Sequence, residues 1–521
     1  MKASIARDLA AGLACILSLV LYGCGGGATV PVTPSVDPAA TLTEATQSDI
    51  RITNTTAGVT PFIASVQLSG QKTSNVASVT YTIAAKPQTV SAALKVTWTI
   101  AALTNHGYVK SPAINLPVAG LYANYVNSVS YVLTFSDNST QTLKNSIPTT
   151  AYIDTTGVYL NPTIIKARTA GSKLGFNFFF LKSTMASPVI VDTDAEVRWM
   201  VPGVAPQEAQ YFEDGQFIVG SANNSSVYLI QLDGKVTKLP VKLPQPLLAS
   251  FTHNIDPGPN GALAEFNGTD DLGASLDDIV AEMSPFTAEA PDQTYDVADI
   301  VSSYMTKHGD NASAFVHPGV NWFHVNSAVY DPSDKSVIIS GREDFLMKVD
   351  YETHNIIWIF GDPTKYWYTF PSLKAKALTL VGGGIYPVGQ HGVTFTSDGH
   401  LMIFNNGYWS DAQPAGKPQG VNRTYSAATA YSINASAMTA KVAWNFDYGQ
   451  KILSQICGSS YEAGKSYLVD FATADHWHEA RLVGLDSSQN VVFDFEYQSP
   501  KNCGAAWNAI PVPFENLQIT K

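Results

Sequence analysis

The stretch TSDGHLMIF, residues 396–404, joins an Asp-Gly turn to a run of apolar residues. Similar units recur elsewhere in the chain: EDGQFIVGS at 213, GPNGALAEF at 258, DPSDKSVIIS at 331 and EAGKSYLVDF at 462. A second unit, a turn followed by a strand that ends in Trp or Phe, alternates with the first: VDTDAEVRWMV at 191, VDYETHNIIWIF at 349, INASAMTAKVAWNF at 433 and LDSSQNVVFDF at 485. Each pair of units would form one four-stranded sheet.

Five clear first units and an atypical sheet near 165–181 indicate about six sheets. We therefore expect an all-β protein whose residues 155–521 form a six-bladed β-propeller. A large sandwich is the alternative, whereas a β-helix would need a much shorter period. Residues 270–320 depart from the repeat, and SLDDIVAEM and TYDVADIVSSYM carry apolar residues at helical spacing. This region is interpreted as an insertion with one or two short helices.

Residues 41–154 have a different pattern of short β-branched alternations separated by turns. This pattern predicts a small N-terminal β-sandwich. No cluster of His, Cys or acidic residues occurs there, so we expect a structural role.

The N-terminus is typical of an export signal, with Lys2 and Arg7 before an apolar run. Leu21-Tyr22-Gly23-Cys24 resembles a bacterial lipobox, which predicts a signal peptide over 1–23 and a lipidated Cys24. Residues 24–40, rich in Gly, Pro and small residues, would be a flexible linker. We expect an exported, periplasmic protein anchored by its lipid, on the outer membrane by resemblance to sorting rules. A plain secretory signal is the alternative.

The composition limits the possible binding partners and indicates the redox state of the cysteines. A net charge of −12 over 521 residues argues against a nucleic-acid partner. Outside the export segment the cysteines are Cys457 and Cys503, and an oxidising compartment favours a disulfide between them. Two separate buried thiols are the alternative.

Three histidines occupy similar positions in the repeat. His253 and His391 each lie eight residues before the glycine of their turn, at Gly261 and Gly399, and His324 precedes its longer turn by a similar distance. Equivalent positions in successive blades lie at equivalent radii. The repeat therefore predicts that the three imidazoles converge near one end of the central channel.

The sequence segments around these histidines resemble those of a known protein family. WFHVNS at 322, SGREDFLMKVD at 340 and WIFGDP at 358 resemble bacterial arylsulfotransferases that do not use the nucleotide sulfate donor. GQHGVTFTSDGHLMIFNNG at 389 and THNIDPGPNGALAEFNG at 252 are similar to two further motifs of that family. The resemblance is strongest over about 250–410 and places the family's nucleophile at His391. It places the other site residues at His253, His324, Asn326 and Arg342.

These residue types suit sulfo transfer from a phenolic sulfate ester to another phenol. A neutral His391 can attack sulfur and form a sulfohistidine, which gives a ping-pong reaction. Arg342 presents a planar set of donors to the sulfonate oxygens and should lower the pKa of His391, while Asn326 can donate without adding charge. His253 or His324 would exchange the phenol's proton, and which of them does so is left open. Trp322, Phe323 and Tyr408 could hold the phenyl rings or pack within the blades.

No cofactor and no metal ion are expected, and a homodimer is left open. Two other functions compete with sulfo transfer. Three converging imidazoles would suit Zn²⁺ or Cu²⁺ in a metal-binding propeller enzyme, although Arg342 in the same cluster would repel a cation. A non-enzymatic lipoprotein that binds a partner or acts as a scaffold at the outer membrane would leave the phased histidines unexplained.

Overall fold

The structure of the protein is a computed structural model. It describes residues 49–187, 189–202, 210–221, 226–240, 248–270, 273–284, 286–287, 289–290, 293–408, 412–499 and 501–521. The predicted export segment, the predicted lipobox with Cys24 and the predicted linker lie outside these residues. Within the described part, no helix combines the length and the apolar character needed to cross a membrane.

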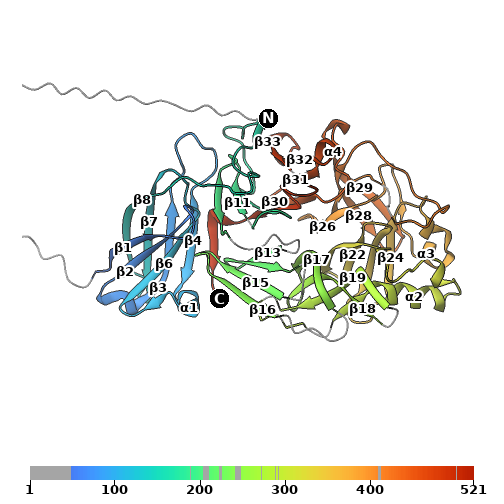
Figure 1. The fold of residues 1–521 in the computed structure, drawn as a ribbon, viewed down its shortest axis with the longest axis horizontal. Helices are drawn as coiled ribbons and strands as arrows, with labels where there is room; N and C mark the ends of the chain where they lie inside the picture. The colour runs from blue at the N-terminus through green and yellow to red at the C-terminus, as the bar shows by residue number, and fades with distance from the viewer. Residues whose placement is uncertain are drawn as a thin grey trace, which may run out of the picture. The chain divides into compact units, whose positions relative to one another are not determined.

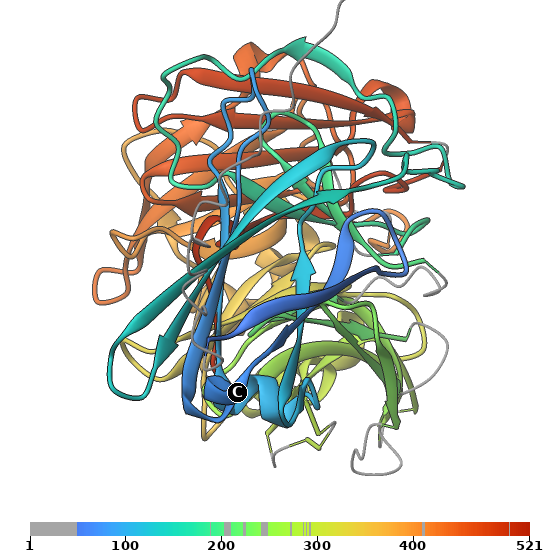
Figure 2. The same ribbon diagram turned by 90° about the vertical axis from the view of Figure 1, so that its left-hand side faces the viewer.

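The first eight strands form two sheets, drawn in blue and cyan in Figure 1 and nearest the viewer in Figure 2. One sheet has the order β1 (Arg51–Ala57), β2 (Ile63–Ser69), β6 (Ala113–Ala119) and β5 (Val109–Lys110). The other has the order β35 (Leu517–Ile519), β4 (Leu94–Thr99), β3 (Val76–Ile83), β7 (Val126–Phe135) and β8 (Thr140–Pro148). In β7 buried residues alternate with more exposed ones, the pattern of a strand with one face on a core.

The C-terminal end of the chain completes this N-terminal domain. Strand β35 pairs in parallel with β4, so residues 517–519 add an edge strand to a sheet formed more than 350 residues earlier in the chain. A short helix, α1 (Ile100–Asn105), follows β4 and is capped by the Thr99 hydroxyl.

Six further sheets of four or five strands occur in the described residues. The first three have the orders β12 (Val197–Met200), β11 (Val189–Asp192), β10 (Phe178–Lys182), β34 (Asn508–Val512); β13 (Gln210–Glu213), β14 (Gln216–Gly220), β15 (Ser226–Gln231), β16 (Val236–Pro240); and β17 (Leu248–Pro257), β18 (Ala262–Asp270), β19 (Gly273–Met283), β20 (Thr294–Asp296). The other three have the orders β21 (Val325–Asp331), β22 (Ser336–Gly341), β23 (Phe345–Asp350), β24 (Ile356–Gly361); β25 (Thr379–Leu380), β29 (Thr439–Phe446), β28 (Ala427–Asn434), β27 (Leu401–Asn405), β26 (His391–Phe395); and β30 (Ser459–Ala463), β31 (Ser466–Thr473), β32 (Glu479–Leu485), β33 (Val491–Gln498), β9 (Thr163–Lys166).

Two of these sheets combine strands from both ends of this region. Strand β34 pairs with β10, and β9 pairs with β33. The predicted all-β architecture is confirmed. The atypical sheet expected near 165–181 is divided between two sheets, because β9 is an edge strand of the β30–β33 sheet, whereas β10 pairs with the edge strand β34 from residues 508–512.

The interpretation of SLDDIVAEM as a helix was wrong, because these residues form part of strand β19. Side chains from both faces of this strand are buried, with Ile279 in one apolar cluster and Val280 in another. A strand buried on both faces has a run of apolar residues that cannot be distinguished from a helical face by spacing alone.

The second segment of that region does contain a helix. Strand β20 leads into α2 (Val297–Lys307), whose first turn is capped by the Asp296 carboxylate. The sheet of β17–β20 therefore extends to residue 296, and the departure from the repeat begins at α2. Two shorter helices, α3 (Pro371–Lys374) and α4 (Ala474–Trp477), lie in later connections.

Candidate active site

The predicted convergence of three histidines is confirmed. His253, His324 and His391 line one cavity of about 620 Å³, and Arg342 lines it with them. Each comes from the edge of a different sheet or from the loop beside it: β17 carries His253, β21 begins directly after His324, and β26 begins with His391. The Arg342 amide donates to the His324 carbonyl at 2.9 Å, so these two residues are neighbours across the β21–β22 hairpin, as expected.

The hydrogen bonds of His391 determine its tautomer. Its Nδ1 lies 2.8 Å from Asn406 Oδ1 and 3.0 Å from the Gly389 carbonyl oxygen, and both of these atoms can only accept. Nδ1 therefore carries the proton. The Cys457 amide donates to Nε2 at 3.2 Å, which agrees with a lone pair on that nitrogen. His391 thus carries its lone pair on Nε2, the form of imidazole that can attack an electrophile.

Asn406 also ties this histidine to the loop that carries Cys457. Its Nδ2 donates to the carbonyl oxygens of Ser454 and Cys457, each at 2.8 Å. One amide side chain therefore fixes both the imidazole and the loop whose N–H contacts Nε2. Sequence inspection missed Asn406, which follows Asn405 at the end of β27; both side chains are buried, which is unusual for asparagine.

Gly389 lies where no other residue fits easily. Its φ is +61°, and a Cβ there would lie 2.4 Å from the Tyr408 carbonyl oxygen. Only glycine avoids both problems, so the turn that brings its carbonyl to His391 Nδ1 depends on this residue.

Burial and charge keep the site histidines neutral. Burial lowers the pKa of His391 to about 3, and the Arg342 guanidinium contributes to the shift. Burial and the same guanidinium lower the pKa of His253 to about 3. Burial, together with His253 and Arg342, also holds the pKa of His324 well below its usual range. The expected direction for His391 is confirmed, but burial is the larger cause.

Arg342 is held beside the histidines by a neighbouring acid. It is almost fully buried, and its Nη1 donates to a carboxylate oxygen of Glu343. A buried guanidinium facing neutral imidazoles is an environment for an anion such as a sulfonate.

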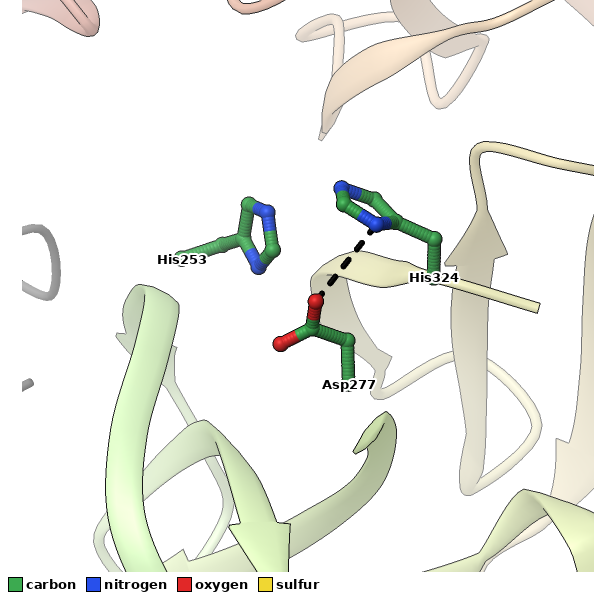
Figure 3. Close-up of side chains that lie close together, drawn as sticks. All are labelled: His253, Asp277 and His324. Atoms are coloured by element: carbon green, nitrogen blue, oxygen red, sulfur yellow. Dashed lines mark ion pairs between the residues drawn. The ribbon is translucent and has the colours of Figure 1, made fainter. Parts of the chain in front are cut away.

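An acidic residue that sequence inspection did not identify lines the cavity itself. Asp277 Oδ2 is 3.4 Å from His324 Nδ1, and Figure 3 shows this pair next to the His253 ring. Asn321 Nδ2 lies 2.7 Å from each of these two atoms. Asp277 belongs to β19, the strand that was misread as a helix, which is why its position in the site was not foreseen.

Four residues around the cavity have left-handed backbone conformations that are uncommon outside glycine. The φ angles are +52° at Asp277, +59° at His324, +56° at Cys457 and +81° at Trp477, all of which line the cavity. Such conformations cost about 1–3 kcal/mol each and are concentrated at functional sites. Their presence here is independent support for a functional cavity.

The predicted Cys457–Cys503 disulfide is present, with the two Cα atoms 6.4 Å apart. Both cysteines are buried, and Cys457 lines the cavity. The bond joins the loop that contacts His391 to the loop that precedes Trp507.

Some predicted residues lie elsewhere. Asn326 is buried and does not line the cavity, and its Nδ2 donates to the Gln390 carbonyl at 2.7 Å. Its contact is therefore with the backbone next to His391, which gives no support to direct substrate binding. Trp322 and Phe323 pack in a hydrophobic cluster, so their side chains are core rather than ring contacts. The aromatic wall includes Trp507 instead, 5.2 Å from His253 between ring centroids.

The geometry also brings possible metal ligands together. In the part of the chain that the structure describes, His253, Asp277 and His324 have ligand atoms within 4.8 Å of one another. The guanidinium of Arg342 lowers the pKa of both histidines, and the same positive field opposes a divalent cation. We therefore do not assign these residues as metal ligands.

Comparison with known families agrees with this site. The model "Arylsulfotransferase (ASST)" matches residues 163–507, which include every residue of the cavity named above. The chain belongs to the arylsulfotransferase family. The family model "Arylsulfotransferase Ig-like domain" matches residues 55–152, which lie in the N-terminal two-sheet domain of this chain.

A curated relative supports the same family. The chain is 28% identical over 182 residues to "Arylsulfate sulfotransferase AssT" of Escherichia coli O6:H1 (strain CFT073). The match covers 31% of this chain and 29% of the relative, so it spans less than a third of either protein.

Among solved structures, two are similar at low TM-scores. The Cps50 (Swd1) β-propeller domain of Myceliophteria thermophila has 11% identity and a TM-score of 0.34, over 66% of this chain and 90% of that domain. A europium-containing methanol dehydrogenase has 13% identity and a TM-score of 0.28, over 72% of this chain and 75% of that chain. At these scores neither match carries weight for the fold.

Proposed function

We propose that this arylsulfotransferase moves a sulfo group from a phenolic sulfate ester to another phenol through a sulfohistidine on His391. The observation that supports this most is the fixed tautomer of His391, because Asn406 and Gly389 hold the proton on Nδ1 and leave Nε2 as a nucleophile. Burial keeps the ring neutral by lowering its pKa to about 3. A nucleophile of this kind divides one difficult transfer into two easier ones.

In the first half-reaction, Nε2 attacks sulfur while the bond from sulfur to the phenolic oxygen breaks. Arg342 stabilises the sulfonate charge, and the Cys457 amide can move from Nε2 to a sulfonate oxygen as the new bond forms. In the second half-reaction, a new phenol takes the sulfo group from Nε2. Trp507 offers an aromatic face to the phenyl ring of either substrate.

The family and the six described sheets support a six-bladed β-propeller as the scaffold, preceded by the N-terminal sandwich. We also propose that the protein is exported, lipidated on Cys24 and held at the outer membrane, with no metal ion required. Mass spectrometry of the membrane fraction should find an acylated peptide that begins at Cys24. An unmodified N-terminus produced by cleavage elsewhere would contradict the lipid anchor.

A burst experiment tests the covalent mechanism. The enzyme is mixed with para-nitrophenyl sulfate without an acceptor. It should release about one equivalent of nitrophenol per site and then slow, with one sulfo group found on the His391 peptide. Addition of a second phenol should restart turnover.

The controls separate the competing functions. Steady release without an acceptor would identify a sulfatase, and no release from any aryl sulfate would favour a binding protein. Loss of the burst on chelation would favour the metal enzyme. His400→Ala is the matched control for His391→Ala, because His400 lies in the turn of the same hairpin and outside the cavity lining.

A further inference from the structure

Sulfo transfer between phenols needs a proton at the right moment. As the first bond from sulfur to oxygen breaks, an unactivated phenolate needs a proton to leave, and the incoming phenol must later lose one. The imidazoles in the cavity bind this additional proton only weakly. Burial and the Arg342 guanidinium hold the pKa of His253 and of His324 well below their usual range.

Asp277 is the group in this cavity whose environment favours holding a proton. Burial raises the pKa of its carboxyl to about 6. The titratable and charged groups that share the cavity with it are His253 on β17, His324 and Arg342 at the β21–β22 hairpin and His391 on β26. Asp278, the next residue on β19, accepts instead from the Trp322 indole at 3.0 Å.

The contacts of His324 suit it to pass on that proton. Asn321 Nδ2 can only donate, so His324 Nδ1 accepts and the ring proton lies on Nε2. Figure 3 shows Nδ1 facing Asp277 while the other ring nitrogen points away from the carboxylate. Asn321 contacts both Asp277 Oδ2 and His324 Nδ1, and these two contacts hold the carboxylate and the imidazole next to each other. His253 has no carboxylate hydrogen-bonded to it within the described residues.

We propose that Asp277 and His324 work as one proton-transfer pair, in which the Asp277 carboxyl stores the proton and His324 exchanges it with the phenolic oxygen. This inference rests on the proposed function and names the group that serves it. Asp277 acts through His324 and is therefore a positioning and proton-holding residue.

Protons and charges are balanced in both half-reactions. In the first, the Nε2 proton of His324 goes to the leaving phenolate, and the Asp277 proton moves to His324 Nδ1. The products are a phenol, a neutral sulfohistidine at His391 and an Asp277 carboxylate, with the single negative charge of the donor conserved. In the second, His324 Nε2 takes the acceptor's proton, and Nδ1 returns its proton to Asp277. The His324 ring never has to carry a full positive charge.

The test compares two donors in Asp277→Asn. Para-nitrophenolate leaves without a proton, whereas unsubstituted phenolate needs one. With phenyl sulfate, the variant should release phenol at least about 10²-fold more slowly than wild type. With para-nitrophenyl sulfate, its burst should stay within about threefold of wild type, because no proton is needed in that step.

The pH profile gives a readout that a purely structural role would not change. For wild type with phenyl sulfate, kcat/KM should fall as pH rises above the Asp277 pKa of about 6, since the carboxyl then loses the proton it must supply. With para-nitrophenyl sulfate the profile should be flat over the same range, and Asp277→Asn should be flat with both donors. Asp278→Asn is the matched control and should keep the wild-type profile.

If the proposed function were wrong, the wild type itself would show no burst. That result differs from every outcome that bears on the proton-transfer pair. Equal losses with both donors would overturn the pair and make Asp277 structural. Unchanged rates with both donors would also overturn it. If Asp277→Asn does not fold, Asn321→Ala replaces it: a loss confined to phenyl sulfate supports the pair, and an equal loss with both donors overturns it.

Discussion

His391 and His324 lie in one cavity, are both neutral through burial and feel the same guanidinium, but the structure gives them opposite tautomers. On the His391 side, Nδ1 contacts carbonyl oxygens, so the proton stays there and Nε2 carries a lone pair. On the His324 side, Nδ1 contacts an amide N–H, so Nε2 carries the proton. The difference between the proposed nucleophile and the proposed proton donor therefore depends on whether an asparagine presents its oxygen or its nitrogen.

This comparison shows that the pKa of a buried histidine does not define its role. Burial and Arg342 act on both rings in the same direction. The partner of Nδ1 decides whether Nε2 carries a lone pair or a proton, because the two nitrogens of a neutral imidazole cannot both carry the proton. The nearby carboxylate of Asp277 adds a proton store to the His324 side alone.

The largest expected effect comes from removing each ring in turn. His391→Ala should lower sulfo transfer by about 10⁴-fold or more with every donor, because no other group can carry the sulfo group. His324→Ala should keep a burst with para-nitrophenyl sulfate, since that donor needs no acid. Stopped-flow release of nitrophenol and mass spectrometry of the sulfo peptide measure both. Equal loss of the burst in the two variants would remove the proposed division of roles.

A smaller effect is expected from removing the asparagine on the nucleophile's side. Asn406→Ala leaves Nδ1 with the Gly389 carbonyl alone and frees the Cys457 loop, so the productive tautomer and the ring position are both less well held. We expect the burst rate to fall by about 10²-fold with either donor, less than the loss recorded when a catalytic histidine is left in the wrong tautomer. A loss limited to phenyl sulfate would place Asn406 on the proton-transfer side instead.

The smallest effect on the rate is expected from the disulfide. Cys503→Ser frees the loop that presents the Cys457 amide to His391 Nε2, which should lower the burst rate by about 10-fold with both donors through looser positioning. The closed loop of 46 residues should also be worth about 4 kcal/mol of stability in the chain-entropy description. Denaturant unfolding and the burst are measured together, below the transition of the variant. A rate unchanged in the folded variant would show that the amide needs no such support.

The sequence by itself was informative where the structure repeats. Asp-Gly turns before apolar strands predicted an all-β chain, and the matching phase of His253, His324 and His391 predicted their convergence. Repeated units place equivalent residues at equivalent positions in their sheets. A residue position that is recognised in one unit can therefore be located in the other units as well. The pairing of Cys457 with Cys503 followed from their being the cysteines outside the export segment.

Tertiary structure alone decided the contacts that lie outside the repeat. Strand β19 is buried on both faces, so its apolar residues were misread as a helix and Asp277 was missed with them. The repeat did not reveal the contact that Asn326 makes through its amide with the backbone of Gln390, and the expected substrate contact of Asn326 stays a prediction. The tautomers of His391 and His324 depend on Asn406 and Asn321, whose orientation follows from neighbours brought in from other loops. Periodicity determines which residues come to the cavity, but hydrogen bonds between segments far apart in the chain determine which nitrogen of each histidine carries the proton.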